Sequence, residues 1–187
     1  MKNIILASQS PRRKELLALL DLNFTVEVRE VNEVFPESLD VSKVAEYLAH
    51  LKAAAFTDIR TDQIIITADT VVILEEQILG KPKNKTEAVK MLESLSNRSH
   101  KVMTGVCIKS KDKTVSFSNT TKVFFKELAS SEINYYIENY KPFDKAGSYG
   151  IQEWIGAIGI TKIEGSYFNV VGLPVQELNE QLQNEYF

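Results

Sequence analysis

The segment Ile64-Ile65-Ile66-Thr67-Ala68-Asp69-Thr70-Val71-Val72-Ile73 is a β-branched, apolar run with no turn-forming residue inside it. Runs of this kind form central strands that are covered on both faces, as in largely parallel sheets. Asp69 lies in the middle, where a carboxylate is costly unless it meets a cation or a metal ion. One interpretation is an aspartate that caps a short strand ending at Ala68. The other is a catalytic or metal-binding carboxylate at the end of a strand, where α/β sheets place their sites.

Strand and helix patterns alternate on both sides of this central run, and strand patterns then cluster in the second half of the chain. This order predicts the α/β class with a mixed sheet. The expected strands lie at 3–7, 24–28, 101–110, 114–128, 158–163 and 168–171, a hairpin turn lies at 74–78, and the expected helices lie at about 11–20, 42–55, 86–95, 131–140 and 174–182.

Composition narrows the class of protein. The 187 residues fit one domain, or one domain with two lobes, and a hydrophobic content of 44% is enough for a sizeable core. A net charge of -3 predicts no general affinity for nucleic acid, so phosphate binding would need local clusters of cations. The lone Cys107 excludes an internal disulfide and favours a reducing compartment. No stretch has the pattern of a signal peptide or the length of a membrane span, so we expect a soluble cytoplasmic protein.

The segment Ser8-Gln9-Ser10-Pro11-Arg12-Arg13-Lys14 is a candidate phosphate site. Ser10 is a favourable N-cap and Pro11 suits the first helical position. Cations in the first turn are unfavourable beside the positive end of the helix dipole, unless an anion docks there. The alternative is a solvated basic surface. The coincidence of serines, cap and cations favours the anion site.

Two lysines and an acidic loop supply further candidates. Lys52 lies at the border of an apolar helical stripe, from which it could extend to water or reach a buried anion. Pro82 forces Lys81 into an extended conformation, which gives its ammonium group a fixed direction, although the local sequence alone favours an ordinary loop lysine. Glu33 belongs to an acidic, irregular segment, in which nothing local distinguishes it from Glu30 or Glu37.

The candidate charges together suit a polyphosphate ester. Cations neutralise phosphate oxygens, while carboxylates hold a divalent metal ion and orient or deprotonate the attacking water. Other familiar devices are missing from the sequence: a P-loop, a dinucleotide-binding glycine motif, a zinc-protease motif and a cysteine pair. A nucleophilic pair of Cys107 and His100 is disfavoured because Cys107 lies in an apolar strand pattern. The cations of the set are Arg12, Arg13, Lys52 and Lys81, and the carboxylates are Glu33 and Asp69.

Several motifs in fixed order resemble one known family nearly end to end. They are Ser8-Gln9-Ser10-Pro11-Arg12-Arg13, Thr67-Ala68-Asp69-Thr70-Val71-Val72, Leu79-Gly80-Lys81-Pro82, His100-Lys101-Val102-Met103-Thr104-Gly105, the segment 144–152 (DKAGSYGIQ) and the segment 165–174 (GSYFNVVGLP). The chain as a whole, 1–187, resembles a single domain of the Maf family of nucleoside triphosphate pyrophosphatases.

This resemblance implies cleavage of a nucleoside triphosphate between its α and β phosphates, with Mg²⁺ or Mn²⁺. It implies an elongated mixed β-sheet flanked by helices, with two lobes and a cleft between them as in the inosine-triphosphatase group, and a homodimer. Asp69 matches the family's proposed proton acceptor. The polar residues around the triphosphate and metal are matched by Ser8, Arg13, Glu33, Lys52 and Lys81, with Glu33 and Asp69 as the metal ligands.

Three residues resemble a subgroup signature that indicates which nucleotide base the family member prefers. Arg12, Thr70 and Gln152 look like the residues of family members that prefer dTTP and UTP, whereas members that prefer 7-methyl-GTP carry tryptophan at the first position. The implied role is the cleansing of nucleotide pools, including modified pyrimidine nucleotides. The alternative is a nucleotide-binding regulator of cell division, or septum formation, with little hydrolysis.

Overall fold

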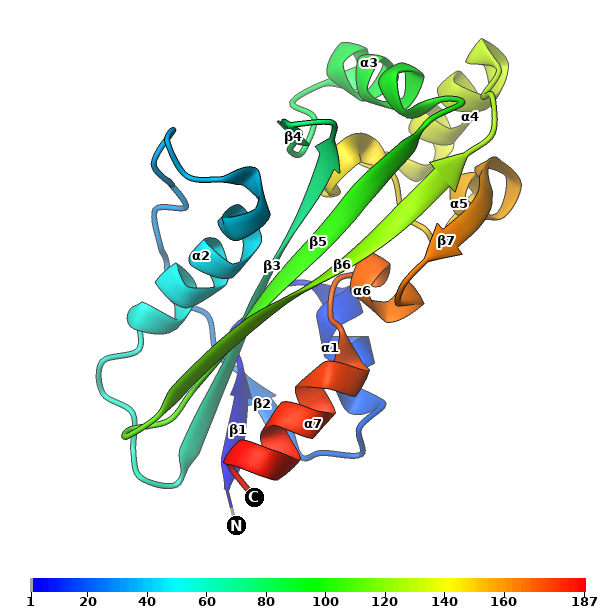
Figure 1. The fold of residues 1–187 in the computed structure, drawn as a ribbon. Helices are drawn as coiled ribbons and strands as arrows, with labels where there is room; N and C mark the ends of the chain where they lie inside the picture. Colours follow the sequence, from blue (N-terminus) through cyan, green and yellow to red (C-terminus); the bar gives the residue numbers. More distant parts are fainter. Residues whose placement is uncertain (1) are drawn as a thin grey trace. The chain divides into compact units, whose positions relative to one another are not determined.

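In the computed structural model, which describes residues 2–187, the chain divides into two compact units. Unit 1 contains residues 2–70, 104–119 and 172–187, and unit 2 contains residues 71–103 and 120–171. The strands β3 (Gln63–Leu74), β5 (Ser99–Lys109) and β6 (Thr114–Phe125) have residues in both units. These strands are labelled in Figure 1.

The strands of residues 2–187 form one seven-stranded sheet with the order β2-β1-β3-β5-β6-β7, and β4 pairs with β3 off this path. β1 (Asn3–Leu6) is parallel to β2 (Phe24–Val26) and to β3. β4 (Gln77–Leu79) is antiparallel to β3, and β7 (Ile160–Glu164) is antiparallel to β6. The expected α/β class with a mixed, helix-flanked sheet is therefore confirmed.

Two helices of unit 1 begin at residues whose side chains cap them. Ser10 caps α1 (Pro11–Ala18), with Pro11 at the first helical position as predicted. α2 (Val41–Ala54) is capped by Asp40, whose side chain accepts from the Ser42 N–H, so the helix begins one residue before the expected start at residue 42. Figure 1 shows α2 on one side of the strands and α7 (Val175–Glu185) on the other.

Close packing of α2 on β5 depends on Gly105. A Cβ atom at this position would lie 2.2 Å from the backbone nitrogen of Glu46 and 2.4 Å from the carbonyl oxygen of Ala45. Any side chain would push the helix away from the strand. The same face of β5 places Cys107 against Ala49 and Ala53 of α2, and this buried contact holds the helix against the strand.

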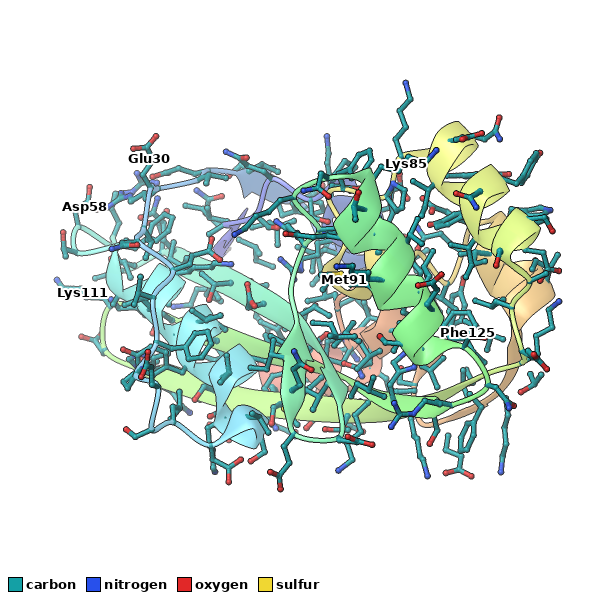
Figure 2. All side chains as sticks on the ribbon, turned by 90° about the horizontal axis from the view of Figure 1, so that it is seen from above. Glu30, Asp58, Lys85, Met91, Lys111 and Phe125 are labelled. Carbon is teal, nitrogen blue, oxygen red and sulfur yellow. The ribbon has the colours of Figure 1, made fainter. Side chains whose placement is uncertain are left out.

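Unit 2 has an aromatic and aliphatic core beneath α3 (Lys85–Leu95) and α4 (Ser130–Tyr140). Lys85 and Glu138 join these two helices through an ion pair of 2.6 Å, and Lys85 extends away from the ribbon in Figure 2. The remaining helical segments of this unit are a 3₁₀ turn at Ala146–Ser148, α5 (Trp154–Gly159) and α6 (Tyr167–Val171).

The segment 168–171 was expected to be a strand, and this expectation was wrong, because the segment lies within α6. The Ser166 side chain accepts a hydrogen bond from the Asn169 N–H and so starts the helical turn. The buried Asn169 amide donates to the Val102 carbonyl and to the Thr121 hydroxyl at 3.0 Å each. A short apolar run cannot be assigned from periodicity alone, and here distant partners decide its conformation.

His100 is a neutral member of the core of unit 2. Its ring stacks on Phe125, labelled in Figure 2, and meets the edge of Tyr149, whose hydroxyl lies 2.7 Å from Nε2. Burial lowers the pKa of His100 to about 4. The folded protein therefore takes up this proton far less readily than the unfolded chain does.

We expect His100 to contribute to acid instability. The His100 ring binds a proton near pH 6.5 in the unfolded chain but only near pH 4 in the folded protein. The free energy of unfolding therefore falls as the pH is lowered from 6.5 to about 4. The loss amounts to about 3 kcal/mol from pH 7 to pH 4. Urea unfolding across this range should show a flatter pH dependence for His100→Gln. The exposed His50 provides the control, because His50→Gln should keep the wild-type slope; an unaltered slope in His100→Gln would refute the assignment.

Candidate active site

A three-residue charge cluster lies in unit 1 between α2 and β3. Lys52, in the last turn of α2, donates to Asp69 Oδ1 at 2.6 Å and lies 3.1 Å from Glu33 Oε2. The Lys52 and Asp69 side chains are 18% and 14% exposed, whereas Glu33 is 51% exposed. Lys52 therefore reaches an anion instead of extending to water.

The acidic loop before α2 contributes one carboxylate to this cluster. Glu30 points outward in Figure 2 and is exposed, whereas Glu33 pairs with Lys52. The sequence offered no local feature that separates these two glutamates. The difference lies in a contact with a residue outside the loop, because only the pairing with Lys52 of α2 distinguishes Glu33.

Asp69 lies in the middle of a strand, as the apolar run 64–73 predicted, and not at a strand end, which both interpretations of its role assumed and which was wrong. β3 continues through Thr70 to Leu74. Its parallel neighbour β1 is shorter: their pairing ends at Leu6 and Ile66, and the Ala7 N–H donates to the Ile66 carbonyl. Asp69 therefore lies just past the carboxyl end of β1, which is where open α/β sheets bind ligands.

Arg13 is the second centre of the site. Its Nε donates to the Gly172 carbonyl at 2.8 Å, and its two terminal nitrogens donate to the Thr70 hydroxyl at 3.0 Å and the Ser8 hydroxyl at 3.4 Å. These acceptors are uncharged. A partly buried guanidinium that is oriented by neutral oxygens keeps its positive charge available to an anionic ligand.

The electrostatic setting links Arg13 to the charge cluster. Burial lowers the pKa of Arg13, the negative charge of Asp69 opposes this change, Arg12 adds to it, and Glu33 opposes it. The guanidinium still remains protonated at any ordinary pH. Two arginines and two carboxylates thus act on one another across a small region of unit 1.

The N-terminus of α1 has the features of an anion site. The Ser10 hydroxyl accepts from the Arg13 N–H at 3.4 Å, and the Ser8 hydroxyl accepts from the Ser10 N–H at 3.2 Å. The first turn contains no acidic residue. The helix dipole and both arginines therefore favour a negative ligand at this end.

Two residues of this arrangement were not singled out in the sequence. The Thr104 hydroxyl lies 2.9 Å from the Thr70 hydroxyl, and the Gly172 carbonyl receives the Arg13 Nε–H. Gly172 has φ of +131°, a conformation that side chains rarely adopt. Both residues belong to motifs that carry the family resemblance, and that is the signal by which they could have been found.

Lys81 and Gln152 belong to unit 2, where both are exposed. Lys81 follows Gly80, whose carbonyl accepts from the Gly147 N–H at 3.1 Å. Gln152 lies in the turn between Gly150 and Glu153. The predicted site residues that the structure places together in unit 1 are Ser8, Arg12, Arg13, Glu33, Lys52, Asp69 and Thr70.

The donor set fits a divalent cation that arrives with a phosphate ligand. Asp69 and Glu33 already share one positive charge, the Lys52 ammonium group. Mg²⁺ is commonly held by one or two carboxylates plus substrate phosphates. Within residues 2–187, no group of three or more His, Cys, Asp or Glu side chains could hold a metal ion without such help.

The described part of the chain favours neither a reactive cysteine nor a membrane-spanning helix. Cys107 is buried, and burial raises the pKa of its thiol to about 11, so it has no thiolate character at neutral pH. Among residues 2–187, no helix combines the length and the apolar composition that crossing a membrane requires.

Comparisons with known proteins give a consistent result. The family model described as "Maf-like protein" matches residues 3–185. The chain is 52% identical over 185 residues to a protein of Flavobacterium psychrophilum, covering 98% of this chain and 95% of that one. It is 51% identical over 181 residues to a protein of Christiangramia forsetii, with 96% and 92% covered. Both relatives carry the name dTTP/UTP pyrophosphatase.

The similarity to solved structures is weaker. The Ham1 protein of Staphylococcus aureus aligns with a TM-score of 0.49 and 17% identity, covering 66% of this chain and 72% of that one.

Proposed function

Because the chain belongs to the family of Maf-like proteins, we propose that it hydrolyses dTTP and UTP to the nucleoside monophosphate and pyrophosphate. The observation that carries this proposal is the cluster of Lys52, Asp69 and Glu33 beside Arg13 at the N-terminus of α1. Such a site combines phosphate-binding cations with carboxylates that can serve metal and water. Modified pyrimidine nucleotides are further substrates under this proposal, and their removal would cleanse the nucleotide pool.

Different residues of unit 1 have different roles in the proposed reaction. Arg13 and the Ser8 hydroxyl bind phosphate oxygens at the N-terminus of α1, and Arg12 adds charge at the same helix end. Lys52 neutralises further negative charge. Asp69 orients the attacking water and accepts its proton.

Asp69 and Glu33 would hold Mg²⁺ or Mn²⁺. When bound, the cation supplies charge neutralisation on the phosphate oxygens. The Lys52 ammonium, which now lies between the two carboxylates, would then be free to turn toward the triphosphate.

The first test is a product assay. Pure protein is incubated with dTTP, UTP, CTP and GTP in the presence of Mg²⁺, and pyrophosphate and orthophosphate are measured separately. We expect pyrophosphate, released mainly from dTTP and UTP. Orthophosphate as the first product would show γ-phosphate cleavage and contradict the proposal. Nucleotide binding without any product would favour the regulator of cell division.

Base preference should depend on Arg12 and Gln152. Truncating either side chain is expected to change the ratio of kcat/KM for UTP over CTP by about tenfold or more, because sites that hydrogen-bond a substrate group discriminate through that contact. The melting temperature should remain near the wild-type value, since both side chains lie at the surface or partly exposed. Gln183→Ala, at an exposed position of α7, is the control. Equal losses for every nucleotide would show that neither residue selects the base.

The proposal extends to a cytoplasmic homodimer without nucleic-acid partners. The family resemblance supports the dimer, and the net charge of -3 opposes general binding to nucleic acid. Light scattering of the pure protein should give twice the chain mass of 21.1 kDa, and a monomeric mass would contradict this part of the proposal.

A further inference from the structure

A backbone hydrogen bond closes the turn that contains Gln152. The Glu153 N–H donates to the Gly150 carbonyl at 3.1 Å, so that Ile151 and Gln152 are the two central residues of the turn. Gln152 is exposed, while Gly150 is buried. The position of the Gln152 amide thus depends on how the two ends of the turn are fixed.

A single hydroxyl group fixes both ends. Tyr136 of α4 is fully buried, and its hydroxyl accepts from the Gly150 N–H at 3.1 Å while it donates to Glu153 Oε2. Gly150 allows this close arrangement, because a Cβ atom there would lie 2.9 Å from Glu153 Cδ. Burial and the hydrogen bond to Glu153 raise the pKa of Tyr136, so the phenol stays protonated and remains a donor.

Lys145 anchors the carboxylate from the other side. Its Nζ lies 3.1 Å from Glu153 Oε1 and 2.8 Å from Asp144 Oδ1, and the residue is 9% exposed. The two oxygens of Glu153 therefore have different partners, one neutral and one charged. A carboxylate held in this way has one orientation, and the start of the turn is connected to it through the Tyr136 hydroxyl.

We propose that Tyr136, Glu153 and Lys145 are positioning residues for Gln152, and that they set the base selectivity of the enzyme through it. This inference rests on the proposed function, in which Gln152 contacts the base. None of the three side chains needs to touch the nucleotide. Their effect is to limit the conformations of the turn, so that the Gln152 amide meets the substrate already oriented.

The test is a double-mutant cycle of Tyr136→Phe and Gln152→Ala. It is read as the ratio of kcat/KM for UTP over CTP, and as the ratio of the Kd of a nonhydrolysable CTP analogue to the Kd of the matching UTP analogue, so that a loss of UTP selectivity lowers both ratios. Tyr136→Phe removes the shared hydroxyl at almost constant volume. It should lower both ratios by about tenfold, as expected for one lost hydrogen bond of this kind, and mainly through KM. In the Gln152→Ala background it should have no further effect on either ratio.

Two more variants complete the design. Tyr135→Phe removes the hydroxyl of the exposed neighbour on α4 and should leave both ratios at the wild-type value. Glu153→Gln keeps an acceptor for Tyr136 but loses the charge that Lys145 pairs with, and it should lower both ratios by a smaller factor. It also provides an independent variant if Tyr136→Phe does not fold.

The outcomes separate this inference from the proposed function. A uniform loss for all nucleotides, or a change that persists in the Gln152→Ala background, would overturn the positioning role. If Gln152→Ala leaves both ratios unaltered while pyrophosphate is still released, the inference fails and the reaction stands. If the wild type releases no pyrophosphate, the reaction fails, and the ratio of Kd values alone decides whether the turn selects the base.

Discussion

Replacing Asp69 with asparagine is expected to abolish turnover and to leave the protein folded. Asparagine has the same shape, and its carbonyl oxygen can still accept the hydrogen bond that Lys52 now donates to Asp69 Oδ1. It loses the negative charge and the basicity that a proton acceptor needs. General base catalysis by a positioned carboxylate contributes about 10²–10⁴-fold, and the rate of pyrophosphate release from dTTP and UTP should fall by at least that factor.

The control for this variant is Asp62→Asn. Asp62 also lies in unit 1, immediately before β3, but it is exposed and pairs with Arg60 at the surface. Its removal should change neither turnover nor the melting temperature, because exposed ion pairs contribute little. Retained turnover in Asp69→Asn, with normal melting, would remove Asp69 from the mechanism. The proposed mechanism would then require a proton acceptor other than Asp69.

Local signals explain what the sequence predicted correctly. The cap of α1 by Ser10 with Pro11 at the first position follows from chemistry within a few residues, and the structure confirms it. The class of the sheet follows from the spacing of apolar runs, which is also a local property. The segment 168–171 shows the limit, because the partners of Asn169 that stabilise its helical conformation come from β5 and β6.

The site itself depended on contacts that no local pattern encodes. Lys52 and Asp69 are 17 residues apart, and the choice of Lys52 between water and a carboxylate depends on how α2 packs on β5 at Gly105. Arg13 and Gly172 are 159 residues apart. The family resemblance supplied Arg13, Lys52 and Asp69, because residues shared by a family reflect the folded site, whereas composition and periodicity describe only the local sequence. Gly172 lies in one of the shared motifs but was not singled out.

Lys52→Met is expected to separate catalysis from metal binding. Methionine preserves most of the apolar stem but removes the ammonium group that Asp69 and Glu33 share. Pyrophosphate release should fall strongly, because a cation is lost from the phosphate site. Without metal, the free energy of unfolding should also fall, by about 1–3 kcal/mol, since the mostly buried Asp69 carboxylate loses its charged partner.

The same variant should gain affinity for a divalent cation in the absence of nucleotide. In the wild type the ammonium group occupies the position between the two carboxylates and competes with any second cation there. Added Mn²⁺ should therefore raise the melting temperature of Lys52→Met clearly and that of the wild type little, because a ligand that binds only the folded state stabilises it. Lys43→Met, at an exposed position of the same helix, should behave like the wild type in both assays. If Mn²⁺ shifts the melting temperatures of Lys52→Met and Lys43→Met equally, Asp69 and Glu33 do not form the cation site, and the metal would have to be held by the nucleotide phosphates with other residues.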